Sequence, residues 1–417
     1  MAWSGPRLWT CAALAALPAS LTAQDASPGG TRLTFGINQS LGVTQNPDLD
    51  PGDTAVSPQA TTSLSLGYLT ETRTERLAID LASGLLIDDT GTRADAPTLS
   101  FDYGRVAADA DLSLTGSIQR RQADSVLTLA DVTAPDGTVV LPTDAGTLNL
   151  DGTLTRAQIG GTLSWGKTAP VGYNLGASVV AQRYGGDAAA VRDDSVTTSL
   201  NAGIRLDITP VLQTTVGLRY THYNLEGGGA PDDRLGGSVT VSFDRPAGAI
   251  SASLDVQDTN DGLRLGLQTA RTFALPDTSL TVELGLSVAP GGGTEATGRL
   301  AYGHTLPRGQ IDLSASRSFV SATDGTERQL TTASASYAMP LTPLSSLQIG
   351  FDLAQTEEDG EGTALTAALQ ASQSFQLTPD WAVSVGARSE LRQDTGVEDA
   401  RRDSLFVSLG RRFVWRP

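Results

Sequence analysis

The sequence predicts an all-β chain that forms a transmembrane antiparallel up-and-down β-barrel. Three observations carry this prediction. Apolar and polar residues alternate along almost the whole chain, the alternating segments are longer than the strands of soluble proteins, and short turns alternate with longer loops. The chain has 417 residues, of which 39% are hydrophobic and 18% are charged. That charged fraction lies below the roughly 25% that is typical of soluble domains.

The first residues have the pattern of a secretory signal peptide. Arg7 precedes an apolar stretch of about ten residues, and the small residues Thr22 and Ala23 come just before Gln24. Ten apolar residues are too few for a membrane-spanning helix, which needs about 20. The single cysteine, Cys11, lies inside this segment, so a chain cleaved near Gln24 has no disulfide. We expect a signal peptide at 1–23, a short lead at 24–31 and one barrel at 32–417.

The period-two pattern begins just after this lead. Between Leu33 and Val43 the odd positions are mostly apolar and the even positions are polar or glycine, which is typical of a strand with one apolar face. About twenty such segments follow one another, each of roughly 9 to 15 residues. A tilted strand crosses the hydrocarbon layer in about 9 to 11 residues, whereas strands of soluble proteins have about 5 or 6. We therefore predict about 20 strands, within a range of 18 to 22.

The connections between these segments alternate in length. One set is short and carries proline, as at Pro276 and Pro307, while the other set is generally longer, glycine-rich and acidic, as at 185–194 and 394–403. Short turns at one end and long loops at the other are typical of outer-membrane barrels. The connection at 122–151 is the longest, and it either folds into the lumen as a constriction or forms a hairpin above the membrane.

Residues at the strand ends agree with a membrane crossing. Many aromatic residues, including Trp165, Tyr302 and Trp381, stand beside the short turns and share the parity of the apolar face. This pattern predicts an aromatic girdle at one membrane interface. Arginines on the apolar face, Arg120, Arg183, Arg271, Arg317 and Arg411, also lie near strand ends, where a guanidinium can reach lipid headgroups.

The C-terminal segment carries a family resemblance. Leu405, Val407, Leu409, Phe413 and Trp415 alternate with mostly polar or small residues. This segment resembles the terminal strand of Gram-negative outer-membrane β-barrels, which the barrel assembly machinery recognises. The whole layout, with its early 46–49 loop (Asn-Pro-Asp-Leu), is similar to porin-type outer-membrane β-barrel families of Gram-negative bacteria. The resemblance implies the cell outer membrane as location, outer-membrane lipid and lipopolysaccharide as surroundings, and transport as a role.

The face opposite the apolar one is expected to line the interior. Glycine, serine and threonine dominate it, which fits a water-filled lumen rather than a packed core. Six arginines and eight acidic residues stand among them, so the charges of the wall nearly cancel. The predicted lumen-lining residues are Asp80, Asp102, Asp111, Arg156, Arg205, Arg219, Asp255, Arg264, Glu283, Arg299, Asp312, Asp352, Arg388 and Glu390.

Several function classes are excluded by composition. The net charge of −17 and the single lysine, Lys167, argue against nucleic-acid binding. With two histidines and no cysteine after the signal, the chain offers no pattern for a catalytic, metal or cofactor site, so we predict that it is not an enzyme. We expect a porin-like diffusion channel for small hydrophilic solutes. The alternative is a non-conducting barrel that acts as an anchor or export component for a surface polysaccharide or a protein.

Two finer expectations follow from this arrangement. Loop acids such as Glu357, Glu358, Asp359 and Glu361 predict a weak cation preference that fades as salt rises. Arginine at Leu284, near the middle of a strand on the lipid side, is expected to cost roughly 2 to 4 kcal/mol, and arginine at the neighbouring Gly285 to cost less.

Overall fold

The computed structural model describes residues 29–47, 49–88, 91–122, 152–190, 193–226, 232–259, 262–290, 292–321, 327–358 and 362–417. These residues form twenty β-strands and one short 3-10 helix, Gly186–Ala190, and contain no helix long and apolar enough to cross a membrane. The strands are β1 (Gly30–Gln45), β2 (Val56–Glu71), β3 (Glu75–Asp88), β4 (Gly91–Val106), β5 (Ala110–Gln122), β6 (Thr153–Trp165), β7 (Val171–Gly185), β8 (Asp194–Thr209), β9 (Leu212–Glu226), β10 (Asp232–Arg245), β11 (Gly248–Thr259), β12 (Gly262–Leu275), β13 (Thr278–Val288), β14 (Thr294–Leu306), β15 (Gly309–Ser321), β16 (Glu327–Thr342), β17 (Ser345–Glu358), β18 (Gly362–Gln376), β19 (Trp381–Asp394) and β20 (Ala400–Trp415).

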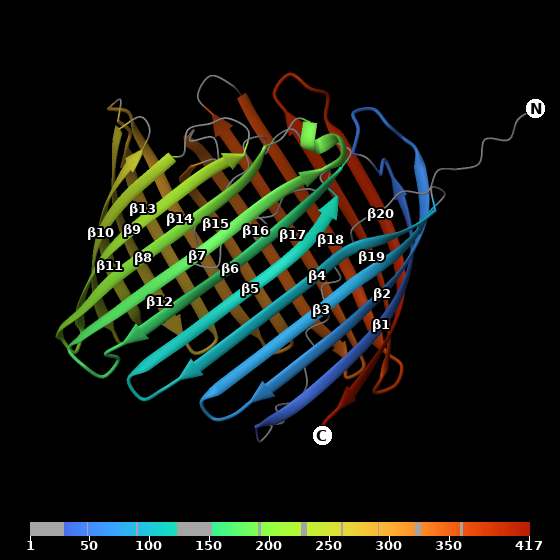
Figure 1. Ribbon diagram of the computed structural model, residues 1–417, viewed down its shortest axis with the longest axis horizontal. Coiled ribbons are helices and arrows are strands. Elements are labelled where there is room, and N and C mark those ends of the chain that lie inside the picture. The colour runs from blue at the N-terminus through green and yellow to red at the C-terminus, as the bar shows by residue number, and fades with distance from the viewer. Residues whose placement is uncertain are drawn as a thin grey trace, which may run out of the picture.

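The strands form one closed sheet. Each strand pairs antiparallel with the next in the chain, and β20 pairs with β1 from Leu33 to Gln45. Figure 1 shows the tilted strands running around the wall of the barrel. Because the sheet is closed, it has no free edge of unpaired backbone groups. A lipid layer requires such closure, since it offers these groups no hydrogen-bond partners. The predicted fold class and the predicted number of strands are both confirmed.

The two ends of the barrel differ as the sequence predicts, but less sharply. β1 begins and β20 ends at the end where all connections are short. At the other end the connections range from two residues, between β11 and β12, to the long segment between β5 and β6. Several loops are shorter than predicted, because the ladder continues beyond the polar residues that suggested a loop: β20 begins at Ala400, inside the predicted loop 394–403. We call these the periplasmic and the external end.

The barrel itself begins at Gly30, two positions before the predicted start at residue 32. The signal peptide lies outside the described residues. So does the segment 123–151, which includes almost all of the long connection 122–151.

Side-chain burial in the barrel is the reverse of that in a soluble protein. Large apolar residues point outward and are exposed, with Leu284 at 65% and Leu405 at 66%. Among the described residues only eight apolar side chains are buried, whereas eighteen polar or charged ones are. An apolar surface on this scale requires lipid around it rather than water. Within each strand, we call the positions on the face of its exposed apolar residues outward, and the alternate positions inward.

Two periplasmic turns depend on glycine. Gly248 and Gly309 follow two-residue turns that begin with proline, and their φ angles are 114° and 118°. A Cβ atom at Gly248 would lie 2.0 Å from the carbonyl oxygen of Thr272, and one at Gly309 would lie 2.4 Å from that of Ala338. Only glycine allows the chain to turn this tightly against the neighbouring strand.

The junction of β1 and β20 is fastened at its external end by the first loop. Asn46 has a φ of 53°, and its Nδ2 donates to the carbonyl oxygens of Asp50, at 2.8 Å, and of Arg401, at 2.9 Å. Arg402 donates from Nη1 to the carbonyl oxygen of Pro47 at 2.9 Å. Leu49 is buried in a small cluster with Ala400. The loop after the first strand is thus bonded to the start of the last one.

Candidate functional site

The inner wall is the candidate site, and the structure places all fourteen predicted residues on its inward positions. Each stands between outward neighbours, as Arg264 does between the exposed Leu263 and Leu265. They come from thirteen strands: β3 to β6, β8, β9, β11 to β15, β17 and β19, with two on β19 and one on each of the others. Contact of any of them with a solute stays a prediction.

The exposure of the fourteen wall residues varies along the barrel axis. Asp80, Arg219, Arg299, Asp312 and Asp352 are exposed on the inner face, in the middle and the periplasmic half of the wall. The buried members, Arg156, Arg264 and Glu390, all lie toward the external end. Charged side chains that point inward and remain exposed indicate space for water beside them.

Two of the predicted residues hold turns at the periplasmic end. Arg205 donates from Nη2 to the carbonyl oxygens of Gly166, Lys167 and Ala169, at 2.9, 3.2 and 3.2 Å, and pairs with Asp207 at 3.3 Å. Asp111 accepts from Lys167 Nζ at 2.7 Å. These contacts fasten the turn between β6 and β7 to its neighbours on both sides.

A buried charge cluster lies on β19 and β20. Glu390, only 5% exposed, is bonded by Arg402 through Oε2 and lies 2.6 Å from Arg388 through Oε1. Arg402 also reaches the first loop, as described above. The structure therefore brings Arg388 and Glu390 together. Glu283 and Arg299 are direct partners in the register of β13 and β14.

Among the described side chains, five inward arginines near the external end were missed by the sequence pattern. They come at strand ends, where polar residues suggested loops, but their parity would have revealed them: Arg121, Arg234, Arg328, Arg392 and Arg402. Arg234 pairs with Asp232 at 2.6 Å, and Arg392 pairs with Asp394. Arg264, on the same part of the wall, donates to Ser287 Oγ at 3.0 Å and lies over the ring of Phe319 at 4.2 Å. The external part of the wall is thus rich in buried arginine.

The loop acids that suggested cation preference are only partly placed. Glu357 is on an outward position of β17 and pairs with Arg317 at 3.3 Å, so it does not face the lumen. Asp359, Glu361 and the side chain of Glu358 lie outside the described residues.

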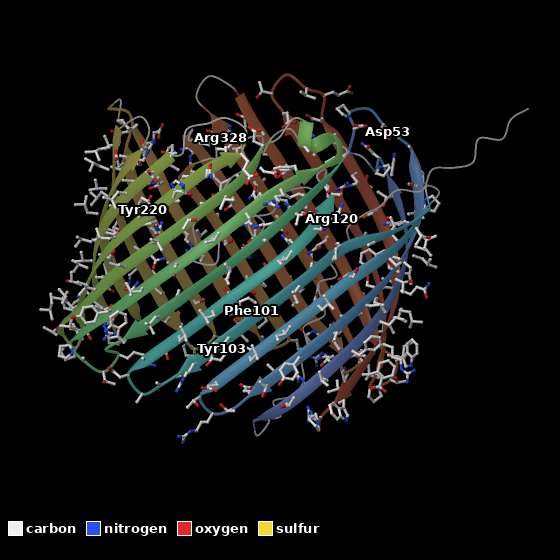
Figure 2. The ribbon with its side chains drawn as sticks, viewed as in Figure 1. Asp53, Phe101, Tyr103, Arg120, Tyr220 and Arg328 are labelled. Atoms are coloured by element: carbon white, nitrogen blue, oxygen red, sulfur yellow. The ribbon has the colours of Figure 1, made fainter. Side chains whose placement is uncertain are left out.

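Both histidines are outward. His222 Nδ1 is 2.7 Å from Asp233 Oδ1, which also accepts from Tyr220 at 2.6 Å. His304 Nδ1 is 2.8 Å from Thr278 Oγ1. Within the described ranges no three His, Cys, Asp or Glu side chains group together as metal ligands. Figure 2 shows Tyr220 on the outside of the wall, toward the external end.

Solved structures share this architecture. A mutant of the ferric enterobactin receptor PfeA from Pseudomonas aeruginosa, in complex with enterobactin, aligns with a TM-score of 0.52 and 8% identity over 93% of this chain and 82% of that chain. The siderophore receptor PirA from Acinetobacter baumannii aligns with a TM-score of 0.52 and 7% identity over 92% and 80%. The fold is that of an outer-membrane β-barrel.

Other comparisons add less. OpdQ from Pseudomonas aeruginosa aligns with a TM-score of 0.40 and 12% identity over 93% of this chain and 98% of that chain. No family model and no curated protein matches the sequence of this barrel. At these identities the likeness to solved structures concerns the fold alone.

Proposed function

We propose that this protein is a porin-like channel of the outer membrane through which small hydrophilic solutes diffuse. The observation that carries the proposal is the inner wall itself. Its middle and periplasmic parts present small polar residues and exposed charges, such as Asp80, Arg299 and Asp312, instead of a packed apolar core. Water beside such a wall gives a polar solute a path that the lipid layer denies it.

The proposal includes how the chain reaches the membrane. Export through a cleaved signal at residues 1–23 and recognition of β20 by the barrel assembly machinery fit the sequence pattern of both ends. The apolar residues of β20 that suggested this recognition, such as Leu405 and Val407, are exposed on the outer face. Outer-membrane lipid and lipopolysaccharide would surround that face.

Ion conductance of the purified protein in a planar bilayer tests the channel. We expect stepwise insertions, each with an open conductance that rises with salt concentration, because ions would cross a water-filled lumen. A preparation of the same protein unfolded before addition serves as the control. Folded protein that inserts into the bilayer without conducting would contradict the channel.

A second candidate, a non-conducting anchor or export component, is favoured by one observation. Inward side chains at the external end, among them Arg156, Arg234, Arg264 and Arg402, are less than 9% exposed. A lumen closed at that end would suit a barrel that displays or exports a surface polysaccharide or a protein. Insertion without conductance is the outcome that this candidate predicts.

Selectivity provides a second measurement on the channel. Of the predicted wall residues that are exposed, three are acidic (Asp80, Asp312 and Asp352) and two are arginines (Arg219 and Arg299). We expect a weak cation preference at low salt that fades as salt rises, since the screening length falls to about 3 Å at 1 M. Reversal potentials under a salt gradient measure it.

Variants that neutralise wall charges test whether the wall, rather than the loops, sets the ion selectivity. Changing Asp80, Asp312 and Asp352 to asparagine should lower the cation-to-anion permeability ratio, and changing Arg219 and Arg299 to glutamine should raise it. A ratio that neither set of changes alters would show that the wall charges do not set the selectivity.

A further inference from the structure

The outward arginines of the barrel fall into three groups by what they contact. At the periplasmic end three lie over aromatic rings: Arg245 over Phe243 at 4.5 Å, Arg271 over Phe273 at 4.7 Å, and Arg411 over Phe413 at 4.3 Å. Another outward arginine of that end, Arg105, pairs with Glu75 at 3.5 Å. At the external end two of them pair with carboxylates on the same face. These are Arg317, 3.3 Å from Glu357, and Arg401, 3.0 Å from Asp403.

Arg120 and Arg183 form the third group. Within the part of the chain that the structure describes, neither lies within 4.0 Å of a carboxylate or stacks on an aromatic ring. Among the described residues, the one hydrogen bond of their side chains is from Arg120 Nη2 to Thr153 Oγ1, at 3.4 Å. Both side chains are exposed. The described part of the chain thus leaves most donors of these two guanidinium groups unused.

The register of the sheet places these two arginines side by side. Arg120 on β5 is opposite Thr155 on β6, and Thr155 is opposite Arg183 on β7. The two Cα atoms are therefore two strand spacings apart, or about 10 Å. Two long, flexible side chains at this separation can converge on one group above Thr155. Figure 2 shows Arg120 near the external end of β5.

The surface beneath this pair faces lipid. Ile118, Ile159 and Val179 have the same parity on the same three strands and are 51%, 55% and 37% exposed. Arginine stems can lie on such a surface while the charged groups reach the headgroup layer. The ligand that fits two adjacent guanidinium groups at this level is an anion held by bidentate hydrogen bonds, and phosphate matches their geometry.

We propose that Arg120 and Arg183, with the hydroxyl groups of Thr153 and Thr155, bind the phosphate of a lipid in the outer leaflet, a phosphorylated glycolipid of the lipopolysaccharide type. The site lies at the external end of the barrel, where that leaflet is found. The inference relies on the outer-membrane location but not on the channel, since the site is on the outer face and does not change with the state of the lumen.

Binding of diphosphoryl lipid A to the detergent-solubilised protein, followed by native mass spectrometry, tests the site. The double variant Arg120→Gln/Arg183→Gln should bind this lipid about 10- to 100-fold more weakly, because two charge-assisted contacts are lost. Lipid A without its phosphates should bind weakly to the wild-type protein and equally to the variant. Loss of binding to both lipids would contradict recognition of the phosphate.

The matched control is Arg317→Gln/Arg401→Gln, which removes the same charge from the same face and the same end. Because these arginines are already paired with carboxylates, we expect an affinity within about twofold of wild type. An equal loss in both double variants would overturn the proposal, since it would show general attraction of an anionic lipid to positive charge.

A conservative variant protects the test against loss of folding. Arg120→Lys/Arg183→Lys keeps both charges but not the bidentate geometry, so its affinity should fall between those of the wild type and the glutamine variant. Unchanged affinity of a correctly folded lysine variant, together with unchanged affinity of the glutamine variant, would exclude the site. Conductance should be the same in all of these proteins, so failure of the lipid site and failure of the channel are distinguishable.

Discussion

Replacing Glu390 with alanine should destabilise the barrel by about 3 to 5 kcal/mol, the usual effect of removing one member of a buried ion pair. Glu390 accepts from Arg402, which is itself only 7% exposed, and pairs with Arg388. Without the carboxylate two arginines would face each other with less compensation. Because Arg388 is partly exposed to the lumen, we expect the lower part of this range.

Reversible urea unfolding of the protein in liposomes measures this effect. The matched control is Asp312→Ala, which removes an inward acid that is exposed and accepts from Gln310 alone among the described side chains, so its effect should stay within about 0.5 kcal/mol. The double variant Glu390→Ala/Arg402→Ala should cost less than the sum of the two single changes, since the pair is coupled. A Glu390→Ala protein as stable as the control would contradict the role of this cluster.

Arginine at Leu284 should cost about 2 to 4 kcal/mol, because this side chain lies near the middle of β13 on the lipid side. At 65% exposed, Leu284 is among the most outward of the apolar residues. The same unfolding measurement applies. An equal cost for arginine on the inward face would contradict the assignment of the two faces.

The inward control requires a change of position from the one that the sequence suggested. Gly285 is next to Leu284, but a Cβ atom there would lie 2.5 Å from Thr297 Oγ1 and 2.8 Å from Gln268 Cγ, so any side chain at Gly285 adds steric strain. Ser314 on β15 is inward and exposed, with a 2.7 Å hydrogen bond to Ser334. Ser314→Arg should cost about 1 kcal/mol or less, chiefly from this lost bond.

The fold was largely predictable because one physical rule governs a membrane barrel. A strand with lipid on one side and water or polar groups on the other must alternate, and that alternation marks both the strand and its faces, as at Leu33 to Val43. Alternation does not predict where the backbone hydrogen bonds between two strands end. Arg402 was assigned to a loop because polar residues surround it, yet the backbone bonds of β20 continue to Ala400.

The contacts of the candidate site were less predictable, because alternation within one strand does not show which residues of other strands lie beside it. Parity predicts that Arg205 and Asp111 point inward, but not that both hold the turn between β6 and β7, because those contacts depend on the pairing of neighbouring strands. Likewise the small size of Gly285 is explained by side chains on β12 and β14 that meet it in space. The register between strands is a property of the folded sheet, and the alternation of residues in one strand does not predict it.

The fastening of the first loop to the last strand has a consequence for how this protein is made. Asn46 and Arg401 are 355 positions apart in the chain, and so are Pro47 and Arg402, yet each pair is hydrogen-bonded. Until the last strand arrives, β1 offers an open edge and Asn46, Pro47 and Leu49 lack these partners. Contacts between such distant parts of a chain form late and slowly. The open edge of β1 must therefore be kept from pairing with other polypeptide chains until β20 is in place.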